Sequence, residues 1–416
     1  MPRKYYLPSM LFDFGLQSSL LLVFFIHGLV YAFLLYRKGR VNETRADQWL
    51  GLFLLLCVLY ISPWMLGFGG WYDNQPYRDI LFYVPFQQLY FIGPVIFFYV
   101  QSLLNPSFRF GKKESWHLIP GLLYLLFSIV MVVTDKLVLK KYFFLASGTD
   151  PDFDTWYQVT GFLSMLTYFV LSLRYYNLYK KLIVQLVSYA ELVMYRWVRN
   201  FLMAFLVMLL VRVTFFILGE FLNLWYGDIW WYFMVFALIF YYIAITGYSN
   251  SVETKVPFKA NLVSYRPTLL LEQRGAGIED NQYTEDADII NIETNTKEQP
   301  ENNEQLSQWK PRLEKLMQEE KSYQDPELSL TQLAKALQTN PSLLSMVINK
   351  GFGMNFNDWV NKYRLEEIKS LFEKGEHKRQ TLLSIAFECG FNSKATFNRA
   401  FKKSTGLTPR EWLSRQ

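Results

Sequence analysis

The sequence predicts an all-α protein in three parts: a polytopic seven-helix transmembrane bundle in residues 1–248, a disordered acidic linker in residues 249–305, and a C-terminal tandem helix-turn-helix domain in residues 306–416. Three observations lead to this prediction. Long apolar runs fill the first part, and a polar stretch in which acidic residues outnumber basic ones follows. The last part combines apolar residues at helical spacing with clustered Lys and Arg.

The apolar runs of the first part each have nearly the length of about twenty residues that a helix needs to cross a bilayer. The first run is long and lacks a small-residue cleavage site, so a secretory signal peptide is not expected. An odd number of spans places the two ends of the chain on opposite sides of the membrane. The seven expected spans are Phe12–Tyr36, Trp49–Gly67, Leu81–Leu104, Trp116–Thr134, Trp156–Tyr179, Val198–Asn223 and Ile229–Gly247.

The basic residues between the spans predict the orientation. Twelve Lys and Arg lie in one set of loops, which includes Arg37, Lys112 and Arg196, whereas the other set has six together with the N-terminus. Cytoplasmic loops carry the excess of positive charge. The N-terminus is therefore expected outside and the C-terminal domain in the cytoplasm.

A few polar side chains lie within the expected spans, where a buried charge costs several kcal/mol unless it faces the bundle interior and a partner. They are candidates for a signal-binding pocket. An interhelical pair with a purely structural role explains Arg212 and Glu220 equally well. The pocket candidates are His27, Gln87, Gln88, Arg212 and Glu220.

The linker differs sharply from the bundle in composition. Residues 251–302 hold 10 acidic and 5 basic residues and show no sustained apolar period. Such a segment buries too little surface to offset its ordering entropy. We expect a flexible tether with a root-mean-square reach of roughly 40 Å. Whether residues 262–271 form a short strand or a helix is left open by the pattern.

Residues 381–404 show the pattern of a helix-turn-helix module. Leu382, Ile385, Ala386 and Cys389 share one face of a first helix, and Gly390 suits a sharp turn. In the second helix the apolar side chains face the first helix, and the opposite face is basic, as a helix that enters the major groove requires. From periodicity alone, a solvated basic hairpin fits as well. The expected outward residues are Lys394, Ala395, Asn398, Arg399, Lys402 and Lys403.

A similar but less basic module is expected at residues 329–350. Asn340 is placed to cap a helix whose first residue is Pro341. An amphipathic helix at residues 356–374 joins the two modules, and a further helix is expected at Leu306–Glu320. The residues expected to point outward toward DNA from the first module are Ser342, Leu343, Ser345, Met346 and Asn349.

The run IA-x-x-x-GF-x-x-x-x-x-F-x-R-x-FKK-x-x-G-x-TP, within Ile385–Trp412, resembles the second helix-turn-helix of the AraC/XylS transcription-regulator family. Thr396 and Trp412 depart from the residues most common in the family. The resemblance implies two recognition helices about one DNA turn apart, with Arg399, Lys394 and Asn398 at base edges. The basic residues expected at phosphates are Lys402, Lys403 and Arg410.

Two fragments of the first part, IGPVIFFYVQSLL and WHLIPGLLYLL, resemble membrane halves joined to AraC-like tails in Bacteroidetes-type bacteria. These resemblances imply a one-component regulator in the bacterial inner membrane. Its bundle would sense a signal and its tail would bind promoter DNA. The partners that they imply are double-stranded DNA, the lipid bilayer, a second copy of the chain, RNA polymerase and a small-molecule or envelope signal.

Motifs of catalysis are absent from the sequence: it has no GxxxxGK[ST], HExxH, GxSxG or CxxC, and only three histidines. We therefore expect no enzyme activity, cofactor or metal. Cys57 and Cys389 are expected as buried reduced thiols. The alternatives are a small-solute transporter with a regulatory or scaffolding tail, and a regulator that is constitutive.

Overall fold

The computed structural model of the chain describes residues 14–146, 148–194, 196–222, 227–250, 258–261, 266–269, 290–291 and 301–415. The chain divides into two compact units. The first unit, the bundle, comprises Met1–Tyr175 and Arg196–Lys255. The second, the C-terminal unit, comprises Val256–Gln416 together with Tyr176–Tyr195, so the boundary between the units falls inside a helix.

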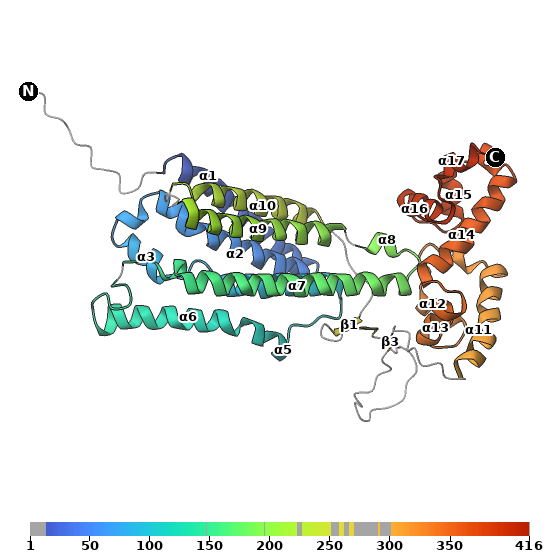
Figure 1. Ribbon diagram of the computed structural model, residues 1–416, viewed down its shortest axis with the longest axis horizontal. Helices are drawn as coiled ribbons and strands as arrows, with labels where there is room; N and C mark the ends of the chain where they lie inside the picture. Colours follow the sequence, from blue (N-terminus) through green and yellow to red (C-terminus); the bar gives the residue numbers. More distant parts are fainter. Residues whose placement is uncertain are drawn as a thin grey trace, which may run out of the picture. The chain divides into compact units, whose positions relative to one another are not determined.

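The bundle is built from long helices that run side by side, with α2 at its centre (Figure 1). Most of α2 is buried because α1, α4 and α10 all pack against it. Small residues allow the close approach of α1 and α2: a Cβ added to Gly51 would lie 2.9 Å from the Ala32 carbonyl oxygen. The long helices are α1 (Leu16–Val41), α2 (Arg45–Phe68), α4 (Leu89–Leu104), α6 (Ile119–Val132), α7 (Thr155–Leu186), α9 (Arg196–Leu222) and α10 (Trp230–Ser249).

Short helical segments connect these helices. Before α4 the chain forms η1 and α3, and before α6 it forms α5 and η2. A π-helical segment, η3, continues α6, and η4 precedes α7. Their bounds are η1 (Trp71–Asp73), α3 (Tyr77–Tyr83), α5 (Lys112–Ser115), η2 (Trp116–Leu118), η3 (Val133–Val138), η4 (Pro151–Phe153) and α8 (Ala190–Val193).

Among the described residues, five helices are long and apolar enough to cross a membrane: Leu16–Val41, Arg45–Phe68, Lys112–Val138, Arg196–Gly219 and Trp230–Ser249. Leu89–Leu104 is apolar but shorter. The helix α7 is not among the five, although it is the longest of the bundle, since Gln, Ser, Thr and Tyr interrupt its apolar residues. The all-α prediction is confirmed, whereas the number of seven spans stays a prediction.

The third expected span, Leu81–Leu104, is wrong as a continuous helix. The chain leaves the helical conformation between α3 and α4, at residues 84–88. Pro85 explains the break, because its ring disfavours the helical conformation in the residue before it. Val84 accordingly has an extended backbone, with φ −88° and ψ 115°.

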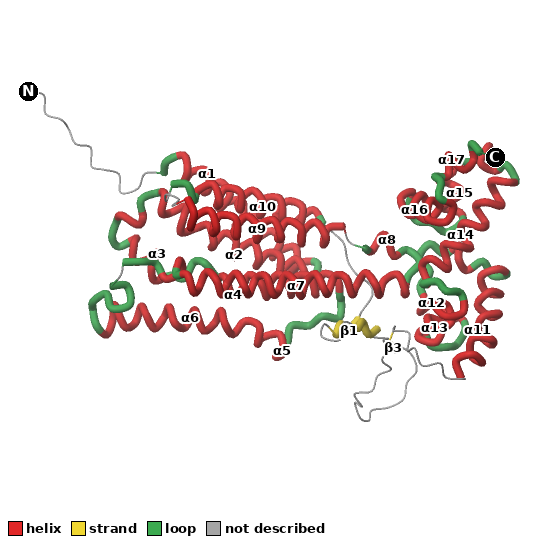
Figure 2. Tube along the Cα trace, viewed as in Figure 1, coloured by secondary structure: helices red, strands yellow, loops and turns green. Residues whose placement is uncertain are grey.

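The C-terminal unit is also helical (Figure 2). Polar side chains cap its helices: Ser329 closes a capping box on α12, Asn340 accepts from the Leu343 amide at the start of α13, and Ser393 accepts from the Thr396 amide at the start of α16. The helices are α11 (Glu301–Gln318), η5 (Ser322–Gln324), α12 (Leu330–Ala336), α13 (Pro341–Gly351), α14 (Phe356–Glu373), η6 (Glu376–Lys378), α15 (Leu382–Glu388), α16 (Lys394–Thr405) and α17 (Pro409–Leu413).

A compact apolar core holds α14, α15 and α16 together. Phe372 of α14, Ile385 and Ala386 of α15, and Phe397 and Phe401 of α16 are all buried in it. Gly390 makes the turn between α15 and α16, with a φ of +94°. A Cβ there would lie 2.3 Å from the Tyr323 carbonyl oxygen, so only glycine fits this turn without a shift of the backbone.

Three short antiparallel strands lie within the expected linker: β1 (Phe258–Asn261), β2 (Arg266–Leu269) and β3 (Ile290–Asn291), paired in the order β1-β2-β3. Residues 266–269 therefore form a strand, which the sequence pattern left undecided. The prediction of a disordered tether over residues 249–305 otherwise falls mainly outside the residues that the structure describes.

Candidate nucleic-acid interface and bundle cavity

The outward face of α16 is basic. Phe397 and Phe401 are 2% and 0% exposed and anchor the helix on its core, as its apolar spacing predicts. The opposite side presents Lys394, Ala395, Arg399, Lys402 and Lys403 to solvent, while Asn398 is half-buried. Arg410, at the start of α17, is also exposed. A helix held by one apolar face, with cationic donors on the other, has the form of a major-groove reading helix.

Two of these cations are engaged in ion pairs within the C-terminal unit. Arg399 Nη1 lies 3.2 Å from Glu191 Oε1. Lys403 Nζ lies 2.7 Å from both carboxylate oxygens of Asp358, in the first turn of α14. Lys394 and Lys402 form no ion pair with the residues that the structure describes.

The first module presents a more neutral surface. Ser342, Leu343, Met346 and Asn349 on α13 are half-buried. The expected outward placement of Ser345 is wrong: it is 6% exposed, and its Oγ accepts from Asn349 Nδ2 at 3.3 Å. Ser345 lies four residues after Pro341 and three before Ile348, so it shares their inward stripe.

Arg364 on α14 links the helices of the C-terminal unit. Its side chain is 1% exposed, and it donates from Nε to the Tyr323 carbonyl at 2.8 Å and from Nη2 to the Asp325 carbonyl at 2.7 Å. Nη1 donates to Asn361 Oδ1 at 3.3 Å, and Nη2 also donates to Ser188 Oγ at 3.0 Å. Burial lowers the pKa of Arg364 to about 10, which leaves it cationic at neutral pH.

Sequence reasoning did not identify Glu191, Asp358 or Arg364 as functional residues. Asp358 and Arg364 lie on an amphipathic helix, and their charges look like ordinary surface charges in the sequence. Glu191 is 208 positions before Arg399, so no local pattern connects the two. The spacing of Arg364 is the one signal in the sequence that could have identified it. It lies four residues after Val360 and four before Ile368, so it falls on the apolar face of α14, where a charged residue is unusual.

The bundle holds a cavity of about 280 Å³ that includes Arg212 and Gln87 among its lining residues. Gln158 joins the two: Arg212 Nη2 donates to Gln158 Oε1 at 2.7 Å, and Gln158 Nε2 donates to Gln87 Oε1 at 2.8 Å. The aromatic rings of Trp64, Phe153, Phe215, Phe233 and others complete the wall. The cavity therefore combines one guanidinium with a mostly apolar lining.

The other pocket candidates lie elsewhere or cannot be placed. His27 packs between the rings of Tyr31 and Tyr241, with centroid distances of 4.4 and 4.2 Å, and does not line this cavity. Gln88 is buried and donates to the Pro85 carbonyl. The side chain of Glu220, and with it the expected Arg212–Glu220 pair, falls outside those that the structure describes.

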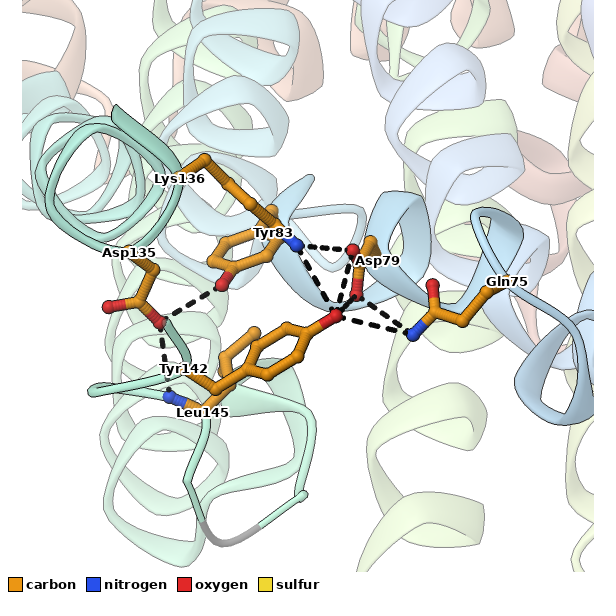
Figure 3. Close-up of polar contacts among 7 residues, drawn as sticks. All are labelled: Gln75, Asp79, Tyr83, Asp135, Lys136, Tyr142 and Leu145. Atoms are coloured by element: carbon orange, nitrogen blue, oxygen red, sulfur yellow. Dashed lines mark hydrogen bonds and ion pairs between the residues drawn. The ribbon is translucent and has the colours of Figure 1, made fainter. Parts of the chain in front are cut away.

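Polar side chains form a network around Asp79 in the bundle (Figure 3). The Lys136 ammonium and the Tyr142 hydroxyl both point at the Asp79 carboxylate, and Gln75 Nε2 donates to Asp79 Oδ1 at 3.2 Å. Burial alone raises the pKa of Asp79, but the hydrogen bonds from Lys136, Gln75 and Tyr142 lower it below its usual value. The network ties α3 to η3 and to the loop that follows it.

Two buried carboxylates lie in the loop between α6 and α7. Asp152 accepts from the Tyr124 hydroxyl at 2.7 Å and from the Gln87 amide at 2.8 Å, and Asp150 Oδ1 accepts from the Asp152 amide at 3.0 Å. Burial raises the pKa of Asp150 to about 8, with a further contribution from Asp152. Burial also raises the pKa of Asp152, to about 6.

We expect the replacement Asp150→Asn to stabilise the bundle increasingly as the pH rises from 5 to 8. A carboxyl whose pKa is raised by folding contributes stability below its unfolded pKa and loses it as the pH rises through its folded pKa. The variant, which cannot ionise, should gain on the order of a few kcal/mol at pH 8. Thermal unfolding of the detergent-solubilised chain measures this, with Asp73→Asn, an exposed position, as control. Parallel pH curves for wild type and Asp150→Asn would contradict the expectation.

Comparison with known proteins supports the assignment of the C-terminal region. Residues 333–415 match the family model described as a helix-turn-helix domain. Two relatives are each 32% identical over 85 residues, or 20% of this chain: the uncharacterized HTH-type transcriptional regulators YtdP of Bacillus subtilis and YijO of Escherichia coli. A third, the uncharacterized HTH-type transcriptional regulator SACOL0084 of Staphylococcus aureus, is 31% identical over 86 residues, or 21% of this chain.

Each of these similarities covers only a part of both chains. The chain spans only 11% of the length of YtdP, 29% of YijO and 11% of SACOL0084. No solved structure matches the chain. The comparisons therefore support a helix-turn-helix domain at residues 333–415 and concern about a fifth of the chain.

Proposed function

Because residues 333–415 form a helix-turn-helix domain of the kind found in HTH-type transcriptional regulators, we propose that the whole chain is a membrane-bound, one-component transcription regulator. It binds promoter DNA sequence-specifically through α13 and α16, and its bundle is fixed in the bacterial inner membrane by seven spans. The N-terminus lies outside and the C-terminal unit in the cytoplasm. The observation that carries the proposal is the exposed basic face of α16 on a chain that also contains five helices able to cross a membrane.

Mapping of the tagged full chain on the chromosome of its host tests the DNA-binding part of the proposal. Discrete promoter peaks that are lost with Arg399→Ala support it. Uniform background signal, with the chain present in the membrane fraction, counts against it. Accessibility of the N-terminus to a membrane-impermeant label in intact cells tests the orientation.

We further propose that the Arg212 cavity receives the signal. A single guanidinium within an aromatic wall suits an amphipathic ligand with an anionic or strongly accepting head group and an apolar body. The head group would replace Gln158 Oε1 as the acceptor of the Arg212 hydrogen bond. Gln158 lies on α7 and donates to Gln87 in the segment that precedes α4. Loss of its hydrogen bond from Arg212 would therefore change the contacts of both segments.

We expect Arg212→Leu to abolish the response to the signal without preventing insertion into the membrane. Leucine removes the head-group donor and lowers the cost of placing this position in lipid. The measurement is the set of transcripts that change when the chain is deleted, compared with the set that changes in the variant, with protein amount in the membrane as control. Arg174→Leu serves as the matched substitution, since Arg174 on α7 does not line the cavity. An intact response in the Arg212→Leu variant would show that this cavity does not receive the signal.

The rival function is transport of a small solute through the bundle, with the C-terminal unit as a regulatory or scaffolding tail. The cavity is the feature that favours it. Solute uptake that persists after deletion of residues 301–416, together with the absence of promoter peaks, would support the transporter. Promoter peaks without uptake support the regulator.

A further inference from the structure

A short segment that follows the last turns of α7 packs within the C-terminal unit. Val187 and Ser188 are 2% and 0% exposed, and Ala190 at the start of α8 is 0% exposed. Val187 forms an isolated antiparallel bridge with Ser329, the residue that caps α12. The Ser188 amide donates to the Leu328 carbonyl at 3.0 Å. We call residues 187–191 the clasp.

The clasp completes a buried polar network at the N-terminal half of α14. Asn357 Nδ2 donates to the Ser188 carbonyl at 2.7 Å, and Arg364 Nη2 donates to Ser188 Oγ at 3.0 Å. Asn357 and Arg364 are 7% and 1% exposed. Buried donors need partners, so the network specifies where the clasp sits rather than allowing it to slide over the surface.

The clasp places a carboxylate on the reading helix. Glu191 Oε1 lies 3.2 Å from Arg399 Nη1, and the Glu191 side chain is only 20% exposed. Glu191 Oε2 is buried and has no hydrogen-bond partner among the residues that the structure describes. Burial raises the pKa of Glu191, and the nearby Arg399 lowers it in part. The Glu191 carboxylate is therefore paired with the guanidinium that is expected to donate to a base edge.

We infer that the clasp is an autoinhibitory contact, and that DNA binding by α16 requires Glu191 to leave Arg399. This inference rests on the proposed function, because it concerns the regulation of the same DNA-binding surface. While Glu191 holds Nη1, the guanidinium cannot present both of its terminal nitrogens to the O6 and N7 acceptors of a guanine. If only a fraction of molecules has the clasp open, the apparent dissociation constant for DNA rises by the inverse of that fraction.

Chain connectivity shows how the bundle could act on the clasp. Residues 176–195 follow the part of α7 that belongs to the bundle and precede α9, which returns to it. A rearrangement of α7 and α9 would therefore displace the chain on both sides of the clasp. No movement of the long linker is needed for this control.

The test uses the full chain in lipid nanodiscs. The probes are a duplex selected by that chain from a random pool and a scrambled duplex of the same composition. Glu191→Gln should bind the selected duplex about 3- to 10-fold more tightly than wild type, because the clasp loses its ion pair. Glu388→Gln removes the same charge from an exposed position of the second module and should leave affinity nearly unchanged. In an Arg399→Ala background, Glu191→Gln should have no further effect.

A second measurement does not depend on any variant. Hydrogen exchange of the amides of residues 187–191 should be slow in the free chain and faster when the selected duplex is saturating. Equal affinities of wild type and Glu191→Gln, or exchange in the clasp that the duplex does not change, would overturn the inference. In that event, binding of the selected duplex that is lost with Arg399→Ala would leave the proposed function standing. Failure of the chain to select any duplex would instead reject the proposed function itself.

Discussion

Replacement of Arg364 by methionine is expected to destabilise the C-terminal unit by about 3–5 kcal/mol. The arginine is 1% exposed and is a donor to the carbonyls of Tyr323 and Asp325, to Asn361 Oδ1 and to Ser188 Oγ. Methionine keeps much of the volume but leaves these acceptors without their donor. A buried acceptor without a partner costs about 1–3 kcal/mol, and two of the four are backbone carbonyls that cannot turn away.

Hydrogen exchange of the α14 amides in the full chain measures this effect, because those amides report the stability of the C-terminal unit and not that of the bundle. Lys374→Met is the control, because it also replaces a cationic side chain by methionine but at an exposed position, the C-cap of α14. We expect it to change the protection of α14 by less than about 0.5 kcal/mol. Equal protection in the two variants would show that the Arg364 network contributes no net stability.

The sequence carries enough information to place the helix-turn-helix helices and much of their outward surface. Apolar residues at spacings of three and four put Ile385 and Ala386 in the core, and both are buried. Capping residues fixed the start of α13 at Pro341. These signals are local: each depends on residues within one or two turns of helix, where spacing alone decides which side chains share a face.

The errors arise where local signals compete or where partners are far apart in the chain. Ser345 is polar, which suggested an outward position, but its place in the stripe of Pro341 and Ile348 buried it. Pro85 breaks the helix within an apolar run that, judged by its composition alone, would form one span. The link from Arg212 to Gln87 passes through Gln158, an inconspicuous glutamine on α7. The pairing of Glu191 with Arg399 depends on tertiary packing, to which no sequence periodicity points.

The replacements Arg399→Ala and Lys402→Ala are expected to weaken DNA binding in different ways. Arg399 lies on the outward face of α16, with a guanidinium that can donate twice to a guanine edge. Its loss should cost about 1–3 kcal/mol on the selected duplex and relax the preference at one base pair. Lys402 lies near the C-terminal end of the helix, and as a phosphate contact it should weaken binding to all sequences alike and reduce the salt slope by about one.

Binding of the full chain to the selected duplex and to variants with single base changes, over a range of salt concentrations, separates the two effects. The clasp adds a consequence for Arg399. Replacement of Arg399 also removes the partner of Glu191, so the clasp opens more easily and the net loss of affinity for DNA is smaller. The Glu191→Gln, Arg399→Ala double variant should therefore match Arg399→Ala alone. If Arg399→Ala and Lys402→Ala reduced affinity equally on every duplex, with the same change in salt slope, both residues would be phosphate contacts. Sequence reading would then have to come from the neutral face of α13 and from Lys394 and Asn398.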